Sequence, residues 1–259
     1  MNSTQDIAPS NAPVVWITGA SQGIGEAVAI ALAREGMTVA ASARNEERLA
    51  ALARQSDELS GRIVPYPLDV TDQTAVHETV NKIIANHGAV DQAILNAGTY
   101  IALPAAEFTS NVVRQQMELN LMGVCHCLEP LIAAMKEQGK GVIAINASLA
   151  GYRGLPKAAG YGASKAALIN MAESLNSELW REGIDIKVIN PGFVKTPLTS
   201  KNRFPMPFLM EVDKAAEVIV QGMKGRQFEI RFPRIFAAIL GLLRHLPYPL
   251  YFWLVRKTG

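Results

Sequence analysis

Short apolar runs alternate with longer, partly polar segments along most of the chain. Apolar runs of this kind, bounded by glycine or polar residues, are typical of strands that are buried on both faces. They predict strands at Val14–Thr18, Thr38–Ala43, Ile63–Leu68, Gln92–Asn96, Val142–Ala147, Ile186–Asn190 and Phe228–Ile230. The segments between them predict helices at Ile24–Glu35, Asn45–Leu59, Asp72–Asn86, Val112–Glu137, Tyr161–Arg181 and Asp213–Lys224. Several of these helices begin near Asn, Asp or Thr and end near glycine, as helix ends favour.

This order predicts an α/β fold, a single doubly wound parallel sheet of about seven strands with helices on both faces. In such sheets, ligands bind beyond the carboxyl ends of the strands. No Pro/Ser-rich or charged linker interrupts residues 14–230, so we expect one domain there. Residues 1–13 are polar and carry prolines, which indicates a flexible arm and neither a signal nor a transit peptide. Residues 231–259 form an apolar and basic tail.

Composition narrows the functional class. A hydrophobic content of 49% over 259 residues is enough for a sizeable core. The net charge of +2 gives no broad electrostatic surface for nucleic acid, so no nucleic-acid partner is expected. Cys125 and Cys127 stand two apart in a predicted helix, where their side chains diverge, so we expect buried thiols in a reducing, cytoplasmic setting. The four histidines are scattered singly, and no metal site is predicted.

A glycine-rich turn follows the first predicted strand. It reads Thr18-Gly19-Ala20-Ser21-Gln22-Gly23-Ile24-Gly25 and leads directly into a helix. Its glycines let backbone approach a pyrophosphate, and the first amides of the helix favour an anion. A strand-to-helix turn without a ligand is the alternative. The position between strand and helix favours a dinucleotide site, which requires that context.

Tyr161 and Lys165 form the second candidate site. A spacing of four on a helix places both side chains on one face, where an ammonium can lower the pKa of a phenol. Tyr161 would then serve as a proton donor and acceptor. The pair alone is common on exposed helices, and it gains meaning only beside a cofactor turn.

With these motifs in one order, residues 14–225 resemble the short-chain dehydrogenase/reductase family, which has a Rossmann-type fold. The turn at residues 18–25 resembles the cofactor turn of the family, Leu95-Asn96-Ala97-Gly98 its strand-end motif, and residues 191–196 its nicotinamide-holding segment. The resemblance is weaker beyond Gly225. It implies a catalytic group of Asn120, Ser148, Tyr161 and Lys165.

The resemblance also implies roles for these residues. Hydride from a nicotinamide attacks a carbonyl carbon, and Tyr161 protonates the oxygen. Ser148 stabilises the developing charge, and Lys165 lowers the Tyr161 pKa and holds the nicotinamide ribose. Asn120 would bind a water that relays protons to Lys165. A buried Asn that satisfies neighbouring backbone is the alternative.

Cofactor contacts follow in the same way. The resemblance places Asn96, Ala97 and Gly98 at the ribose, and Pro191, Val194 and Thr196 at the carboxamide, where a plain loop is the alternative. The full implied set is Gly19, Ser21, Gln22, Gly23, Ile24, Gly25, Arg44, Asp69, Val70, Asn96, Ala97, Gly98, Tyr161, Lys165, Pro191, Val194 and Thr196. Asp69 would contact the adenine amine, or cap the helix that follows, or both.

The end of the second strand bears on cofactor choice. Ala43 stands where family members that prefer NAD usually carry Asp, and Arg44 offers a guanidinium to a 2′-phosphate. We therefore expect NADP(H) over NAD(H). The alternative is that Arg44 only caps the strand or pairs with Glu46 or Glu47 in solvent.

Two apolar segments bear on the substrate. Residues 197–212 fall where the family places a substrate lid, and Phe204, Met206, Phe208 and Met210 would make an apolar cover. This favours a hydrophobic carbonyl substrate. Packing of these side chains against the sheet or a partner subunit is the alternative.

The tail carries the second apolar segment. Arg244, His245, Pro247 and Pro249 interrupt it, so neither half reaches the roughly 20 residues of a membrane span. Its aromatic residues with basic flanks fit a segment in a membrane interface: Tyr248, Tyr251, Phe252, Trp253, Arg231, Arg234, Arg244, Arg256 and Lys257. A subunit contact or a cover over the substrate cleft remain alternatives.

The leading functional hypothesis is an NADP(H)-dependent oxidoreductase that interconverts a hydrophobic carbonyl and a secondary alcohol, as a ketone reductase. The expected partners are a small substrate, further copies of the chain and, through the tail, peripheral contact with a membrane. A non-catalytic NADP-binding scaffold or sensor is the alternative. Turnover of NADPH with apolar ketones distinguishes the two.

Overall fold

The computed structural model describes residues 12–201 and 205–256. Most of the expected N-terminal arm therefore lies outside the described residues. So do Phe204 of the expected lid and Lys257 of the tail.

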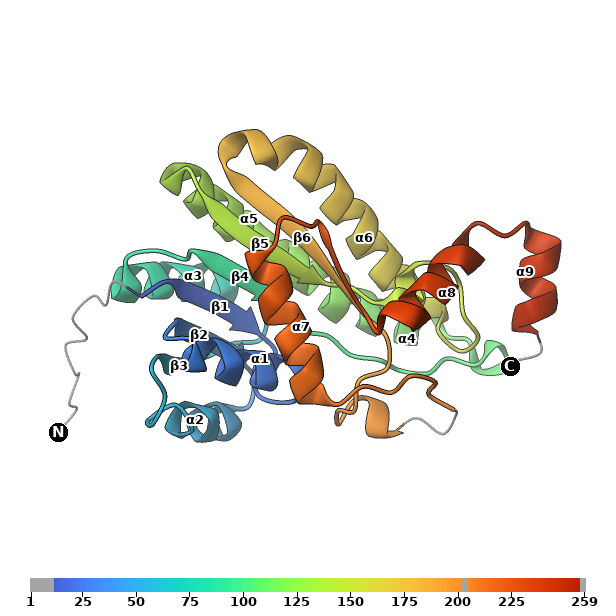
Figure 1. Ribbon diagram of the computed structural model, residues 1–259, viewed down its shortest axis with the longest axis horizontal. Coiled ribbons are helices and arrows are strands. Elements are labelled where there is room, and N and C mark those ends of the chain that lie inside the picture. The colour runs from blue at the N-terminus through green and yellow to red at the C-terminus, as the bar shows by residue number, and fades with distance from the viewer. Residues whose placement is uncertain (1–11, 202–204, 257–259) are drawn as a thin grey trace.

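The described residues form one seven-stranded sheet in which every pairing is parallel (Figure 1). The strands are β1 Val14–Thr18, β2 Thr38–Ala43, β3 Arg62–Pro67, β4 Gln92–Leu95, β5 Gly141–Asn146, β6 Ile184–Pro191 and β7 Glu229–Phe232. Their order is β3-β2-β1-β4-β5-β6-β7. The winding reverses between β1 and β4, which confirms the doubly wound parallel sheet.

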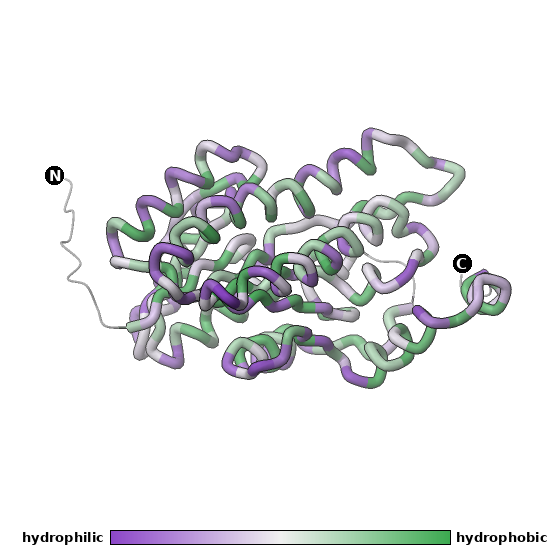
Figure 2. Tube along the Cα trace, turned by 90° about the horizontal axis from the view of Figure 1, so that it is seen from above, coloured by the Kyte–Doolittle hydropathy of each residue, from purple (hydrophilic) through white to green (hydrophobic). Residues whose placement is uncertain are grey.

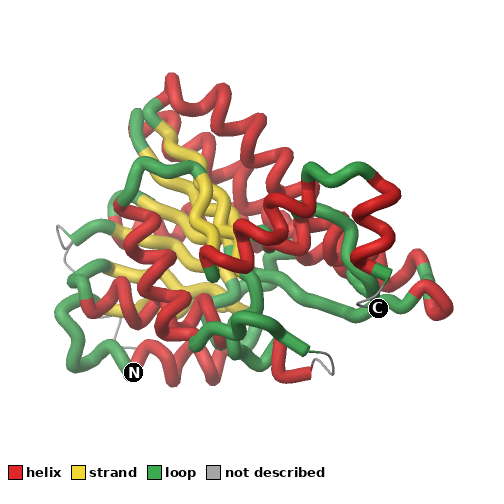
Figure 3. The backbone as a smooth tube through the Cα atoms, turned by 45° about the vertical axis from the view of Figure 1, so that its right-hand side comes forward, coloured by secondary structure: helices red, strands yellow, loops and turns green. Residues whose placement is uncertain are grey.

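Helices separate the strands along the chain. The main ones are α1 Gly23–Arg34, α2 Glu46–Arg54, α3 Gln73–His87, α4 Ser110–Met117, α5 Gly123–Gln138, α6 Ala159–Leu179, α7 Val212–Lys224, α8 Arg234–Arg244 and α9 Tyr248–Val255. Short turns of helix are η1 Ala105–Glu107, η2 Glu118–Met122, η3 Leu149–Gly151, η4 Trp180–Glu182 and η5 Thr199–Lys201. Figure 3 shows the strands as one twisted layer with helices on both sides.

Successive side chains of each strand point to opposite faces of the sheet, and so they form two hydrophobic cores. In β1, Trp16 points to the face covered by α3, α5 and α6, whereas Ile17 points to the face covered by α1, α2 and α7. Both side chains are fully buried. The interior of the molecule in Figure 2 accordingly carries much of the hydrophobic colour. A sheet buried on both faces explains why the strands are continuously apolar in sequence.

Two helix boundaries differ from the expectation. The helix α2 ends at Arg54 and not at Leu59, because the Ser56 hydroxyl donates to the Ala53 carbonyl and accepts from the Ile63 amide, which turns the chain toward β3. The long helix expected from Val112 to Glu137 is divided into α4 and α5 by η2, a π-helical turn. Such single π-turns occur inside otherwise regular α-helices, and the apolar pattern of this segment did not reveal one.

The tail adds two helices that were not predicted, α8 and α9. The strand β7 includes Arg231 and Phe232, which the expected boundary assigned to the tail. No helix within the described residues is long and apolar enough to cross a membrane.

Candidate active site

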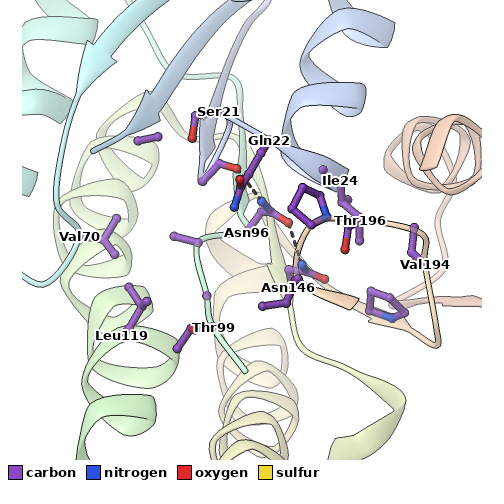
Figure 4. Close-up of a pocket in the computed structure, with 18 of the residues that line it drawn as sticks. Ser21, Gln22, Ile24, Val70, Asn96, Thr99, Leu119, Asn146, Val194 and Thr196 are labelled. Carbon is purple, nitrogen blue, oxygen red and sulfur yellow. Dashed lines mark hydrogen bonds between the residues drawn. The ribbon is translucent and has the colours of Figure 1, made fainter. Parts of the chain in front are cut away.

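A cavity of about 400 Å³ lies beyond the carboxyl ends of the strands, where the winding reverses (Figure 4). Its lining includes the glycine-rich turn, the residues that follow β2, β3, β4 and β5, the start of α6, and the loop after β6. This is the place where doubly wound sheets bind ligands.

The glycine-rich turn is tied to the neighbouring strand ends. The Thr18 hydroxyl accepts from the Asn96 and Ala97 amides at 3.0 and 3.1 Å. The Asn96 side chain donates to the Thr18 and Gly19 carbonyls and accepts from the side-chain amide of Asn146 at 2.8 Å (Figure 4). These bonds fix the ends of β1, β4 and β5 relative to one another.

Backbone geometry explains the glycines of the turn. Gly19 and Gly23 have φ of +67° and +62°, a region that disfavours other residues. A Cβ on Gly25 would lie 2.4 Å from the Gly19 carbonyl oxygen and 2.6 Å from Asn96 Nδ2. Gly25 therefore permits close packing of α1 against the turn, and it does not line the cavity.

The start of α1 suits an anion. Gln22 precedes the helix in an extended conformation, and no hydrogen bond from its side chain caps the helix. The first amides of α1 are thus available at the cavity, with the positive end of the helix dipole. The turn therefore fits the pyrophosphate of a dinucleotide.

Ser148, Tyr161 and Lys165 meet at the other end of the cavity. Ser148 follows β5, and Tyr161 and Lys165 stand one turn apart on α6. Lys165 Nζ lies 5.7 Å from the centre of the Tyr161 ring and donates to the Asn146 carbonyl at 2.7 Å. Ser148 hydrogen-bonds the Tyr161 hydroxyl. A hydroxyl, a phenol and an amine are thus assembled around one point.

Burial governs the titration of this group. It raises the pKa of Tyr161, and the hydrogen bond from Ser148 offsets part of the rise. Burial also lowers the pKa of Lys165 to about 7. The expected lowering of the Tyr161 pKa by Lys165 is therefore not seen: desolvation by burial is the largest cause of the shift, and Lys165 does not contribute to it. The phenol keeps its proton at neutral pH, which is the form that a proton donor needs.

The depressed pKa of Lys165 leads us to predict how the stability of the fold depends on pH. Between pH about 7 and its ordinary value of 10.5, the folded protein lacks a proton that the unfolded chain retains, so stability should rise with pH. We expect the free energy of unfolding of the wild type to gain on that of Lys165→Met by up to about 1.4 kcal/mol per pH unit in this window. Denaturant unfolding of both proteins at pH 7 and 9 measures the difference. Parallel pH profiles would contradict a buried amine of low pKa.

Asn120 lies outside the cavity. Within η2 it is fully buried, and its side chain accepts from the Thr99 amide at 2.7 Å and donates to the Thr99 carbonyl and to Ser164. The side chain thus satisfies neighbouring backbone, which is the alternative role for this residue. These bonds fix the loop after β4 against α6.

The opposite end of the cavity is basic. Arg44 Nη1 lies 3.7 Å from Asp69 Oδ2, so Arg44 pairs with Asp69 and not with Glu46 or Glu47. The Arg44 side chain is 73% exposed. Arg48, which was not anticipated, also lines the cavity and donates to Gln22 at 2.6 Å. Only the fold brings Arg48 to the turn, since Asn45 caps α2 and orients its first turn.

Asp69 does not cap the following helix. Its Oδ1 accepts from the amide and hydroxyl of Thr71, and Asp72 caps α3 instead. Asp69 thus forms an Asx turn just before the helix, and Asp72 is the residue that caps it.

Asn146 is the second residue that the sequence did not reveal. It bridges Asn96 and Lys165, and it stands at the end of β5 as a polar residue after an apolar run. A polar residue directly after an apolar strand is the sequence feature that could have identified Asn146.

Every expected site residue except Gly25 and Asn120 lines this one cavity. The set comprises Gly19, Ser21, Gln22, Gly23, Ile24, Arg44, Asp69, Val70, Asn96, Ala97, Gly98, Ser148, Tyr161, Lys165, Pro191, Val194 and Thr196. The described residues contain no cluster of three or more metal-binding side chains. The two cysteines are free thiols, Cys127 buried and Cys125 half-buried.

Known proteins resemble the chain over most of its length. The family model for short chain dehydrogenase matches residues 13–206. An uncharacterized oxidoreductase of Myxococcus xanthus is 37% identical over 91% of this chain and 93% of its own. A 3beta-hydroxysteroid dehydrogenase of Mediterraneibacter gnavus is 33% identical over 81% of this chain and 74% of its own.

A solved structure agrees with these relatives. An alcohol dehydrogenase from the archaeon Thermococcus sibiricus, complexed with 5-hydroxy-NADP, superposes with a TM-score of 0.78 at 28% identity, over 86% of this chain and 96% of that one. The cavity fits the nicotinamide cofactor that such enzymes use. The chain therefore belongs to the short-chain dehydrogenase/reductase family and is an NAD(P)-dependent oxidoreductase.

Proposed function

We propose that the protein is an NADPH-dependent reductase of hydrophobic ketones. The observation that carries the proposal is the meeting of Ser148, Tyr161 and Lys165 at one end of the dinucleotide-shaped cavity. A protonated phenol beside a hydroxyl donor is the arrangement that carbonyl reduction requires.

The residues divide the chemistry between them. A nicotinamide cofactor held in this cavity would supply the hydride for the carbonyl carbon. Tyr161 donates its proton to the carbonyl oxygen, and Ser148 donates a hydrogen bond to the same oxygen as negative charge develops there. Lys165, held by the Asn146 carbonyl, is placed to bind ribose hydroxyls and to take part in returning a proton to Tyr161. Asn120 would support the group by positioning the loop at Thr99.

Preference for NADPH rests on the basic end of the cavity. Arg44 and Arg48 both line it, and no acidic residue follows β2 directly. Asp69 approaches Arg44 only at 3.7 Å, so a 2′-phosphate can compete for the exposed guanidinium. Asp69 and Val70 would then border the adenine, as the family resemblance implies.

Replacing Arg44 tests this preference. We expect Arg44→Ala to weaken NADPH binding about tenfold and to leave NADH binding nearly unchanged, because one charged contact to the phosphate is lost. Titration of both cofactors into the wild type and the variant gives the ratio. The matched control is Arg54→Ala, on the same helix as Arg48 and outside the cavity lining. An unchanged ratio in Arg44→Ala would mean that another residue holds the phosphate.

Hydrophobic substrates are favoured by the segment beside the nicotinamide end. Pro197 and Leu198 line the cavity, and Phe208 and Leu209, further along the expected lid, are exposed. The relative named for a hydroxysteroid acts on an apolar alcohol, which supports the same class here.

The alternative of a non-catalytic NADP-binding scaffold is tested by turnover. NADPH consumption is followed by nicotinamide absorbance with a series of apolar ketones and aldehydes. A reductase consumes NADPH in proportion to the ketone, whereas a scaffold binds NADPH without consuming it.

We propose that the enzyme works as a homo-oligomer in a reducing compartment, consistent with its free thiols, and contacts membranes only peripherally, through its tail.

A further inference from the structure

The helices α8 and α9 project from the sheet layers at the C-terminal end of the molecule (Figures 1 and 2). Their exposed side chains are mainly large and apolar. On α8, Ile235, Ile239 and Leu242 form one stripe, and Leu242 is 69% exposed. On α9, Leu250 and Phe252 are exposed as well, on different sides of that helix. We use the name tail face for these five exposed apolar residues of the two helices. Exposed apolar surface of this kind marks an interaction site.

Charge on the tail has one sign. From Pro233 to Gly259 the sequence contains no Asp or Glu, and it contains Arg234, Arg244, Arg256 and Lys257. The three arginines are exposed. A tail face bordered by cations complements a negative surface, whereas apposition of two copies of the same face would bring like charges together.

The tail is fixed to the loop that follows the catalytic serine. The Arg153 guanidinium donates to the carbonyls of Leu243 and Leu246 at 2.6 and 2.7 Å, and it lies 3.9 Å from the centre of the Tyr251 ring. The Tyr251 hydroxyl donates to the Gly154 carbonyl. The turn between α8 and α9 is therefore held in one geometry.

The inner side of α8 packs against the segments that carry lining residues at the Ser148 end of the cavity. Phe236 stacks on Phe193, in the loop after β6, and on Phe208, in the expected lid, with centroids 5.6 and 5.9 Å apart. Leu240 packs on Leu149, the residue after Ser148. The tail face and the mouth of the active site thus belong to one end of the molecule.

We propose that the tail face binds the surface of an anionic lipid bilayer and so presents the substrate end of the cavity to lipophilic ketones dissolved there. The apolar residues enter the interface while the arginines contact lipid phosphates, as interfacial helices do. The substrate part of this inference rests on the proposed function. The lipid part does not, because it needs no catalysis.

Flotation of the full-length, NADPH-loaded protein with vesicles tests the lipid part. We expect flotation with equal parts phosphatidylcholine and phosphatidylglycerol, weaker flotation with phosphatidylcholine alone, and loss of the difference at high salt. Leu242→Glu should weaken lipid affinity at least about tenfold, since it removes a leucine that the bilayer interface would bury and adds a negative charge. The matched control is Trp180→Glu, which makes the same kind of change at a 62% exposed site at the far end of α6.

Two outcomes overturn the proposal. One is a wild type that stays unbound to anionic vesicles while Leu242→Glu dissociates an oligomer in sedimentation, which would make the tail face a subunit contact. The other is equal loss of flotation in Leu242→Glu and Trp180→Glu.

Turnover then tests the substrate part. With a long-chain ketone carried in the vesicles, Leu242→Glu should be slowed about as much as its lipid affinity falls, while reduction of a short, water-soluble ketone should be unchanged. If the wild type and Leu242→Glu reduced the vesicle-borne ketone at equal rates, the proposal that substrate is delivered from the bilayer would be wrong. Flotation without reduction of either ketone would reject the proposed function and leave lipid binding standing.

Discussion

Tyr161→Phe is expected to lower kcat for ketone reduction by about a hundredfold to ten-thousandfold, the usual range for loss of a general acid. NADPH affinity should be nearly unchanged, because the phenylalanine ring can still pack edge-on against Tyr100, whose ring centre lies 5.2 Å away, and beside Lys165. The raised pKa keeps the Tyr161 hydroxyl protonated, so its removal takes away a proton that is present at neutral pH. Steady-state rates and NADPH titration of both proteins give the two quantities.

Tyr100→Phe is the matched control. It removes a neighbouring phenol from the same aromatic contact, but Tyr100 does not line the cavity, so turnover should persist. A loss of less than roughly tenfold in Tyr161→Phe would reject Tyr161 as the proton donor.

Ser148→Ala is expected to lower kcat by about a hundredfold to a thousandfold, the range found when one donor to a developing oxyanion is removed. Two effects combine at this position. The hydroxyl that would face the carbonyl oxygen is lost, and so is the hydrogen bond that offsets the rise in the Tyr161 pKa. The loss should appear in kcat more than in KM, because the oxygen is most negative in the transition state.

Ser148→Thr separates chemistry from structure. Ser148 also accepts from the Ala150 amide at 3.1 Å and so caps η3, which makes some loss of stability expected in the alanine variant. Threonine keeps the hydroxyl, and the extended backbone of Ser148 accepts a β-branched residue. Recovery of most of the rate by threonine supports the donor role. Equal rates in Ser148→Ala and the wild type would remove Ser148 from the mechanism.

Much of the fold follows from local sequence. The strands β1 and β2 have the expected bounds, since an apolar run in a sheet buried on both faces has clear ends. The candidate catalytic group was proposed from the helix spacing of Tyr161 and Lys165 together with the family resemblance. The candidate cofactor turn was proposed from its glycines, two of which have positive φ in the structure.

What could not be predicted depends on contacts between distant segments. Arg48 reaches the cavity only because α2 packs beside the turn, and Asn146 matters only because it joins Asn96 to Lys165. The same holds for the fully bonded side chain of Asn120. The tail had an interfacial composition, but Pro247 and Pro249 obscured its two helices: Pro247 immediately precedes α9, and Pro249 lies in the first turn of α9, where proline is tolerated.

Deuterium transfer tests the central claim most directly. NADPH labelled with deuterium at the transferable position is incubated with 2-alkanones of increasing chain length, and the alcohols are analysed by mass spectrometry. The account predicts deuterium at the carbinol carbon with the wild type, product formation that increases with chain length, and little product with Tyr161→Phe. A wild type that binds NADPH yet labels none of the ketones, or a Tyr161→Phe variant that labels them equally well, would contradict it.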